Sequence, residues 1–124
     1  MAVPILQQGP ILIASLQAAL TDRDLMLMQD QLATSIGRLR TRGVVLDVTA
    51  LDVLDSFASR TIRGIAYIAR LRGAETVVVG IQPEVAFAMV ELGLTLEGIA
   101  TALDLEEGLA LLRKVVESGS PGAE

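Results

Sequence analysis

Asp52, Asp55 and Ser56 lie close together, between an apolar run and an amphipathic segment. Residues 44–48 have the β-branched composition of a buried strand, and the residues after Ser56 repeat apolar side chains at helical spacing. Ser56 is therefore predicted at the N-terminus of a helix. Free N–H groups and the positive end of the helix dipole favour an added phosphate there, although the two aspartates would repel it. The pattern suggests a phosphorylation switch.

A structural role for the same residues is the simpler interpretation. Ser and Asp are the ordinary N-cap residues, so position alone favours Ser56 as a helix cap with no regulatory role. Ser59 lies one helical turn further along and is predicted to be a hydroxyl on the helix surface. The sequence leaves open whether Ser59 is a second acceptor.

The composition excludes most catalytic chemistry. Cysteine and histidine are absent, which removes zinc sites, thiol nucleophiles, Ser-His-Asp triads and imidazole acid-base chemistry. A phosphate-binding loop would need clustered glycines followed by Lys and Ser or Thr, and the chain has no such motif. The sequence therefore predicts a non-enzymatic protein with no catalytic residues, no cofactor and no metal.

Charge and hydrophobicity point to protein partners. The net charge of −5 comes from 15 acidic and 10 basic residues, so a nucleic-acid interface is not expected. The hydrophobic fraction is 52% before glycine is counted, against about 45–50% with glycine in an ordinary soluble domain. With one Tyr, two Phe and no Trp, the surplus is aliphatic and suits contacts between subunits. We therefore expect homo- or hetero-oligomers.

Several absences predict a soluble cytoplasmic protein. No apolar run approaches the 18 or more residues that indicate a membrane span. The N-terminal segment has no Lys or Arg before Arg23, so it lacks the charged region of a signal peptide. Disulfides cannot form, which fits a reducing compartment.

Strand and helix patterns alternate along the 124 residues and predict one α/β domain. Strands are expected at 3–8 and 11–15, around Gly9-Pro10, then at 44–48, at 76–79 and near Ile99. Helices are expected from Thr21 or Asp22 to before Gly43, from Ser56 to about Arg72, from Pro83, and through the last apolar repeat. The predicted core positions of the first helix are Leu25, Met28, Leu32, Ile36 and Leu39, and Met26 is also placed in the core. Residues 118–124 are predicted to be a flexible tail.

The segment Asp55-Ser56-Phe57, placed between a strand and a helix, resembles the signature of the STAS domain family. That family includes anti-sigma-factor antagonists with an Asp-Ser phosphoacceptor at this junction. The Phe variant, in place of the commoner Asp-Ser-Ser-Gly, is similar to the RsbS-type scaffold antagonists of the bacterial stressosome. Residues 80–86, 91–93 and 101–109 carry a second block of likeness, and the resemblance extends to about Val116.

The resemblance implies a single STAS domain over residues 1–117, with a mixed sheet and helices packed mainly on one side. It implies that Ser56 is the phosphoacceptor and that Asp47, Asp52 and Asp55 support its loop. Phe57, Arg60 and Arg63 are candidate partner contacts. Arg60, Arg63 and Arg70 are also spaced to share a helix face, which by itself indicates an ordinary solvated surface.

The function implied by the resemblance is regulatory. An RsbT-type Ser/Thr kinase would be held in a large complex with an RsbR-type sensor protein and released when it phosphorylates Ser56. An RsbX-type phosphatase would reset the system. The alternative within the same family is a small-ligand-binding module in which Ser56 is only a helix cap.

Overall fold

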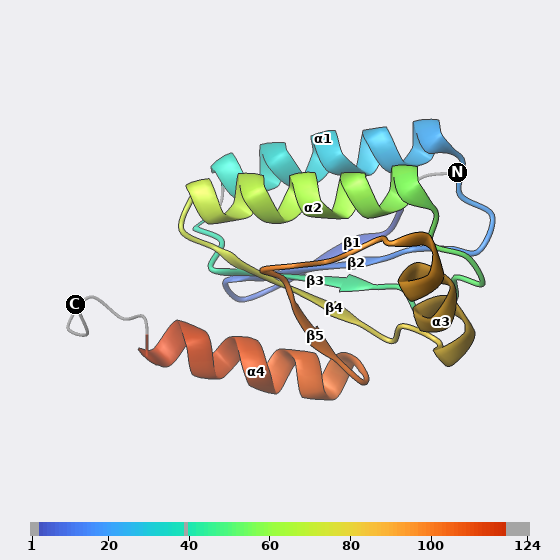
Figure 1. Ribbon diagram of the computed structural model, residues 1–124. Coiled ribbons are helices and arrows are strands. Elements are labelled where there is room, and N and C mark those ends of the chain that lie inside the picture. Colours follow the sequence, from blue (N-terminus) through green and yellow to red (C-terminus); the bar gives the residue numbers. More distant parts are fainter. Residues whose placement is uncertain (1–2, 39, 119–124) are drawn as a thin grey trace.

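The computed structural model describes residues 3–38 and 40–118, which form a five-stranded sheet and its flanking helices (Figure 1). The strands are β1 (Ile5–Gln8), β2 (Ile11–Ser15), β3 (Gly43–Asp47), β4 (Glu75–Val79) and β5 (Ala100–Ala102). The helices are α1 (Asp22–Arg38), α2 (Ser56–Leu71), α3 (Pro83–Leu92) and α4 (Leu105–Ser118). The predicted order of strands and helices is confirmed.

The strands lie in the order β1-β2-β3-β4-β5. β1 is antiparallel to β2, while β2, β3, β4 and β5 are parallel neighbours, so the sheet is mixed. In the central strand β3, Val44 and Leu46 belong to one core cluster and Val45 to another. Both faces of β3 are thus buried, as its continuous apolar run predicts.

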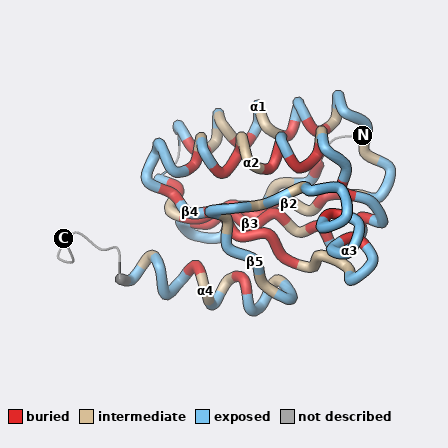
Figure 2. Tube along the Cα trace, viewed as in Figure 1, coloured by how far each residue is buried: buried red, intermediate tan, exposed pale blue. Residues whose placement is uncertain are grey.

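The helices form unequal layers on the sheet (Figures 1 and 2). α1 and α2 lie together on one face, and α3 adds Val85 and Met89 to the core beneath them. α4 packs on the opposite face, where Leu112 meets Val45 and Val77. The prediction of helices mainly on one side is confirmed, with α4 as the covering of the other face.

Helix α1 shows one success and one error of the sequence interpretation. At its start, the Thr21 N–H donates to the Asp24 carboxylate over 3.0 Å, and this bond holds the pKa of that carboxyl below its usual value. Leu25, Met28, Leu32 and Ile36 are buried as predicted, and Leu39 lies outside the described residues. The core assignment of Met26 is wrong. Its side chain is 55% exposed, because a residue two positions before the buried Met28 lies on the opposite side of the helix.

The C-terminal boundary differs from the prediction by one residue. Ser118 is the last residue of α4, and residues 119–124, predicted to be a flexible tail, lie outside the described part. Across 3–38 and 40–118, no helix has the length and apolar character needed to cross a bilayer.

The expected apolar surplus on the surface is confirmed. Large hydrophobic side chains are more than half exposed on several elements: Leu6, Met26, Val53, Tyr67, Leu71, Phe87, Val90, Leu92 and Leu103.

Candidate functional site

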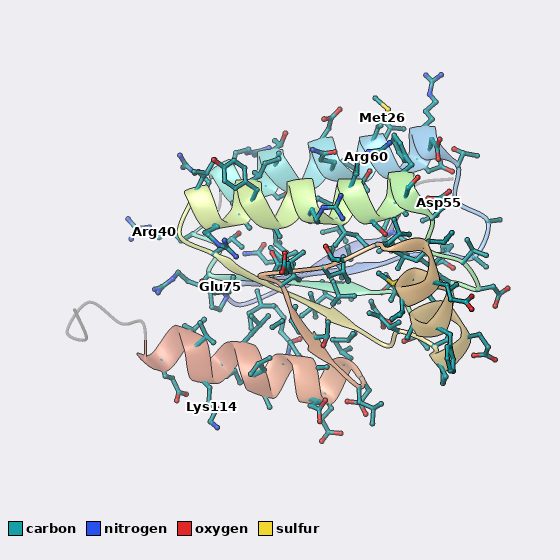
Figure 3. All side chains as sticks on the ribbon, in the orientation of Figure 1. Met26, Arg40, Asp55, Arg60, Glu75 and Lys114 are labelled. Carbon is teal, nitrogen blue, oxygen red and sulfur yellow. The ribbon has the colours of Figure 1, made fainter. Side chains whose placement is uncertain are left out.

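The predicted phosphoacceptor lies at the edge of the sheet where the parallel strands end. The loop of residues 48–55 follows β3 and leads into α2, and the shorter loop of residues 80–82 follows β4 and leads into α3. In Figure 3, Asp55 projects at this end of the molecule, near the start of α2 and above α3. Such edges are where open α/β sheets ordinarily present their functional groups.

Asp47 fixes the beginning of the loop. Its carboxylate accepts hydrogen bonds from the Thr49 N–H over 3.0 Å and from the Thr49 hydroxyl over 2.6 Å. The Val48 N–H donates to the Val79 carbonyl over 2.9 Å, which extends the pairing of β3 with β4. These hydrogen bonds engage the Asp47 carboxylate within the first residues of the loop.

Two leucines hold the middle of the loop against the core. Leu51 is 7% exposed and Leu54 is 4% exposed, whereas Asp52 and Val53 between them are exposed. The Leu51 N–H donates to the Val48 carbonyl over 3.0 Å and forms a turn. The loop therefore presents Asp52 and Val53 outward from a fixed base.

Asp55, and not Ser56, is the N-cap of α2. The Asp55 backbone is extended, and its carboxylate accepts a hydrogen bond from the Ala58 N–H over 2.8 Å. The alternative in which Ser56 serves as the cap is thus wrong, because Asp55 already holds that position. Ser56 is the first residue of the helix and is exposed.

The groups around Ser56 suit an added anion. Within the described residues, no hydrogen bond engages the Ser56 hydroxyl or the backbone N–H groups of Ser56 and Phe57. These N–H groups are the unpaired donors of a helix N-terminus, where phosphate oxygens are readily accommodated. Asp52 and Asp55 remain close in sequence and oppose the anion electrostatically.

Ser59 does not lie on the surface, contrary to the prediction. It is 0% exposed, and its hydroxyl is buried without a hydrogen-bond partner. The reason is that α2 packs both on the sheet and against α1, so its buried stripe is wider than the one predicted from Ala58, Ile62, Ile65 and Ala69. Of the two serines in the first turn, only Ser56 can be reached from outside.

The loop after β4 supports the loop after β3. The Gln82 side-chain amide donates to the Thr49 carbonyl over 2.8 Å. Gly80 has φ +82°, and a Cβ built there would lie 3.1 Å from the Thr49 backbone. Gly80 and Gln82 lie in the second block of family likeness, but that likeness does not reveal their contacts with Thr49.

The three arginines predicted to share one face of α2 divide into two groups. The Arg60 guanidinium lies 5.9 Å from the centre of the half-buried Phe57 ring, and Arg60 itself is exposed. Arg63 and Arg70 instead donate 2.8 Å hydrogen bonds to the carbonyls of Thr95 and Gly98. These two arginines tie α2 to the segment between α3 and β5, which gives them a structural task. Arg60 is exposed at the start of α2, and the Phe57 ring beside it is half-buried against the core.

Acidic and apolar side chains near Ser56 line a cavity. A cavity of about 330 Å³ is lined by Asp22, Asp52, Asp55 and apolar neighbours that include Leu25 and Ala58. Among the residues that the structure describes, no three acidic side chains are placed to hold a metal ion.

Known proteins resemble this chain in sequence and in structure. The RsbT co-antagonist protein RsbRA of Bacillus subtilis (strain 168) is 30% identical over 104 residues, which are 80% of this chain and 38% of RsbRA. A serine-to-glutamate variant of Moorella thermoacetica RsbS superposes with a TM-score of 0.82 at 35% identity, over 93% of this chain and 97% of that one.

A stressosome structure, described as that of a signal integration and transduction hub, contains a similar chain. Its TM-score is 0.77 at 36% identity, over 90% of this chain and 97% of that one. The STAS domain family matches residues 2–108. Because this match covers most of the sequence, the chain belongs to the STAS domain family.

Proposed function

We propose that this chain is a non-enzymatic scaffold of stress signalling that binds an RsbT-type Ser/Thr kinase and releases it when phosphorylated on Ser56. The observation that carries the proposal is the difference between the two serines of the first helical turn. Ser56 is exposed with an unengaged hydroxyl, whereas Ser59 is fully buried. The likeness to RsbS over nearly the whole of both chains supports the same role.

The descriptions of two relatives support the proposed partners. RsbRA is a co-antagonist of RsbT by its own description, and another similar chain is part of a stressosome. We infer that this chain assembles in the cytoplasm with copies of itself and with an RsbR-type protein, and that an RsbX-type phosphatase removes the phosphate. The exposed apolar side chains provide surface for such assembly.

Charge is the proposed means of release. A phosphate on Ser56 adds roughly −1.5 to −2 charges at neutral pH, beside Asp52 and Asp55. The free N–H groups of the first turn offset part of the repulsion, so the domain stays folded. The main effect is on a bound partner, because the phosphate occupies an exposed position next to the half-buried Phe57 and the exposed Arg60.

Labelling identifies the acceptor. The chain is incubated with its cognate RsbT-type kinase and ATP, and intact mass and phosphopeptide mapping are recorded. We expect one phosphate on Ser56 in the unaltered chain and in the Ser59→Ala control, and none in Ser56→Ala. A phosphate mapped to Thr49 or Ser59, with Ser56 unmodified, would refute the assignment.

Titration calorimetry of kinase into three variants tests the release step. Ser56→Asp should weaken binding by some 5- to 150-fold, the range of an ordinary coupling of about 1–3 kcal/mol. Ser56→Asn has nearly the same size without charge and should bind as tightly as Ser56→Ala. Equal affinities for the Asp and Asn variants would show that charge does not drive release.

A small-ligand role is the second candidate, and one observation favours it. A groove of about 570 Å³ runs between β1 and α1, and its polar lining includes Gln7, Asp30, Gln31, Thr34 and Ser35. The groove lies apart from the Ser56 loop, so ligand binding there would not require phosphorylation. A ligand-induced rise in melting temperature that Thr34→Val abolishes, in a chain that no kinase labels, would favour this candidate.

A further inference from the structure

Arg60 has two neighbours in the first turn of α2. Phe57 precedes it by three residues and Ser56 by four, and side chains at these spacings meet on a helix surface. Helical side chains also lean toward the N-terminal end of their helix, so the Arg60 guanidinium is directed back over this turn. Its position, 5.9 Å from the centre of the Phe57 ring, agrees with that direction. Arg60 can therefore reach either neighbour.

The contact between Arg60 and Phe57 is weak. Arg60 is exposed, and a cation above an aromatic ring at an exposed site is held by little more than the ring quadrupole. Within the part of the chain that the structure describes, no hydrogen bond or ion pair engages the Arg60 guanidinium. Arg63 and Arg70 differ, because each donates a hydrogen bond to a backbone carbonyl. Of these three arginines, Arg60 is the one that can move without breaking a hydrogen bond.

We propose that Arg60 leaves the Phe57 ring when Ser56 is phosphorylated and binds the phosphate. This inference rests on the proposed phosphorylation of Ser56, and it names the side chain that then holds the phosphate. A guanidinium donates two parallel N–H bonds to phosphate oxygens, which is a stronger contact than the one with an exposed ring. The order along the helix is also favourable, since an anion four residues before a cation is the better orientation of such a pair.

The acidic groups nearby oppose the phosphate but do not occupy Arg60 beforehand. Asp52 and Asp55 precede Ser56 in the loop, and with Asp22 of α1 they line the cavity of about 330 Å³. The Asp55 carboxylate already accepts the N–H that it caps. Negative charges near a phosphate raise its second pKa, whereas a cation lowers it by favouring the dianion. Because the aspartates stay the same when Arg60 alone is varied, the change in this pKa measures the effect of Arg60.

Movement of Arg60 changes the surface beside Ser56 in two ways. The phosphate neutralises the positive charge of Arg60, and the face of the Phe57 ring that the guanidinium covers is exposed. The ring itself stays packed against the core. A partner whose acidic group contacts Arg60 in the unmodified chain loses that contact. Phosphorylation thus removes a binding group as well as adding negative charge.

Phosphorus NMR of the full chain with phosphoserine in place of Ser56 tests the pairing. The phosphoserine is inserted during translation, so the result does not depend on which residue a kinase selects. Failure of the pairing would likewise leave the labelling of Ser56 by its kinase intact. We expect Arg60→Gln to raise the second pKa of the phosphate by about 0.2–0.7, which is the effect of an exposed ion pair. Arg60→Lys keeps the charge without the paired N–H donors and should raise this pKa by less.

A matched control and a second signal complete the experiment. Arg72→Gln removes the same charge from the far end of α2 and should leave the phosphate pKa unchanged. In proton–nitrogen spectra, the Arg60 Nε–H signal should shift when phosphoserine replaces Ser56, while the signals of Arg63 and Arg70 stay in place. An equal phosphate pKa in Arg60→Gln and Arg72→Gln would overturn the pairing. An Arg60 signal that does not shift would overturn the movement away from the ring.

Discussion

Two loops carry the chain from a parallel strand into a helix at the same edge of the sheet, and they are built differently. Residues 48–55 connect β3 to α2 and end in Asp55, whose side chain caps the helix. Residues 80–82 connect β4 to α3, where Gln82 is the N-cap residue without a side-chain capping bond and Pro83 follows at the first turn.

The first loop exposes a hydroxyl group, whereas the second loop supports the first. The first loop places a hydroxyl on the first turn of its helix, and the N–H groups beside it are unpaired. The second loop begins its helix with a proline, which has no N–H to offer an anion. Its Gln82 and Gly80 instead contact Thr49 of the first loop. Neighbouring strand–helix junctions of similar position therefore have different tasks.

The largest effect is expected at Gly80. Alanine there would have to adopt φ +82° and bring its Cβ to 3.1 Å from the Thr49 backbone. The left-handed backbone costs an alanine about 1–2 kcal/mol and crowding a further 1–3 kcal/mol, so urea unfolding should show a loss of about 2–5 kcal/mol. Gly73→Ala is the matched control, because Gly73 has φ +84° and open space around it. Gly73→Ala should lose only the stability that the left-handed backbone costs. Equal losses of stability in the two variants would show that the close contact between Gly80 and Thr49 has no effect.

An intermediate effect is expected at Asp55. Asp55→Ala removes the hydrogen bond to the Ala58 N–H and should lower the free energy of unfolding by about 1 kcal/mol. Asp55→Ser keeps a capping oxygen without the charge and should recover most of this loss. A Ser variant as unstable as the Ala variant would show that charge, rather than the capping bond, stabilises the start of α2.

The smallest effect on stability is expected at Gln82. Gln82→Ala removes one hydrogen bond at an exposed position, which is worth about 0.5–1 kcal/mol at most. Hydrogen exchange of the Leu51 N–H, which closes the turn after β3, should become faster. Gln82→Glu is the control, since a carboxylate cannot donate to the Thr49 carbonyl and should loosen the loop further. Unchanged exchange in both variants would mean that the second loop does not support the first.

The sequence predicted most strands and helices because they have a strong apolar repeat, which the short and largely exposed β1 and β5 lack. The continuous apolar run of β3 indicated a central strand, and the stripe from Ala58 to Ala69 indicated the buried side of α2. What it could not predict is the width of a buried stripe. Ser59 is buried because α1 packs beside α2, which no repeat within one helix reveals. Met26 is different, because the spacing within α1 itself places it on the side opposite the buried Met28.

The candidate site was predictable only in part, for a related reason. Ser56 and the aspartates stand out by residue type, and their position before an apolar repeat places them at a helix start. Asp55 and Ser56 are adjacent, so a shift of the helix start by one residue decides which of them is the N-cap. The bonds of Arg63 and Arg70 join residues that are 32 and 28 positions apart, so they depend on tertiary structure alone.

The anchoring of the loop before Ser56 restricts how any modifying enzyme can recognise this chain. Leu51 and Leu54 are buried, and Asp55 is bonded to the helix, so the segment cannot be drawn into an extended cleft without removing side chains from the core. An enzyme that modifies Ser56 must therefore read a conformational epitope rather than a linear peptide. Unfolding would destroy such an epitope, so any enzyme of this kind would act only on the folded domain.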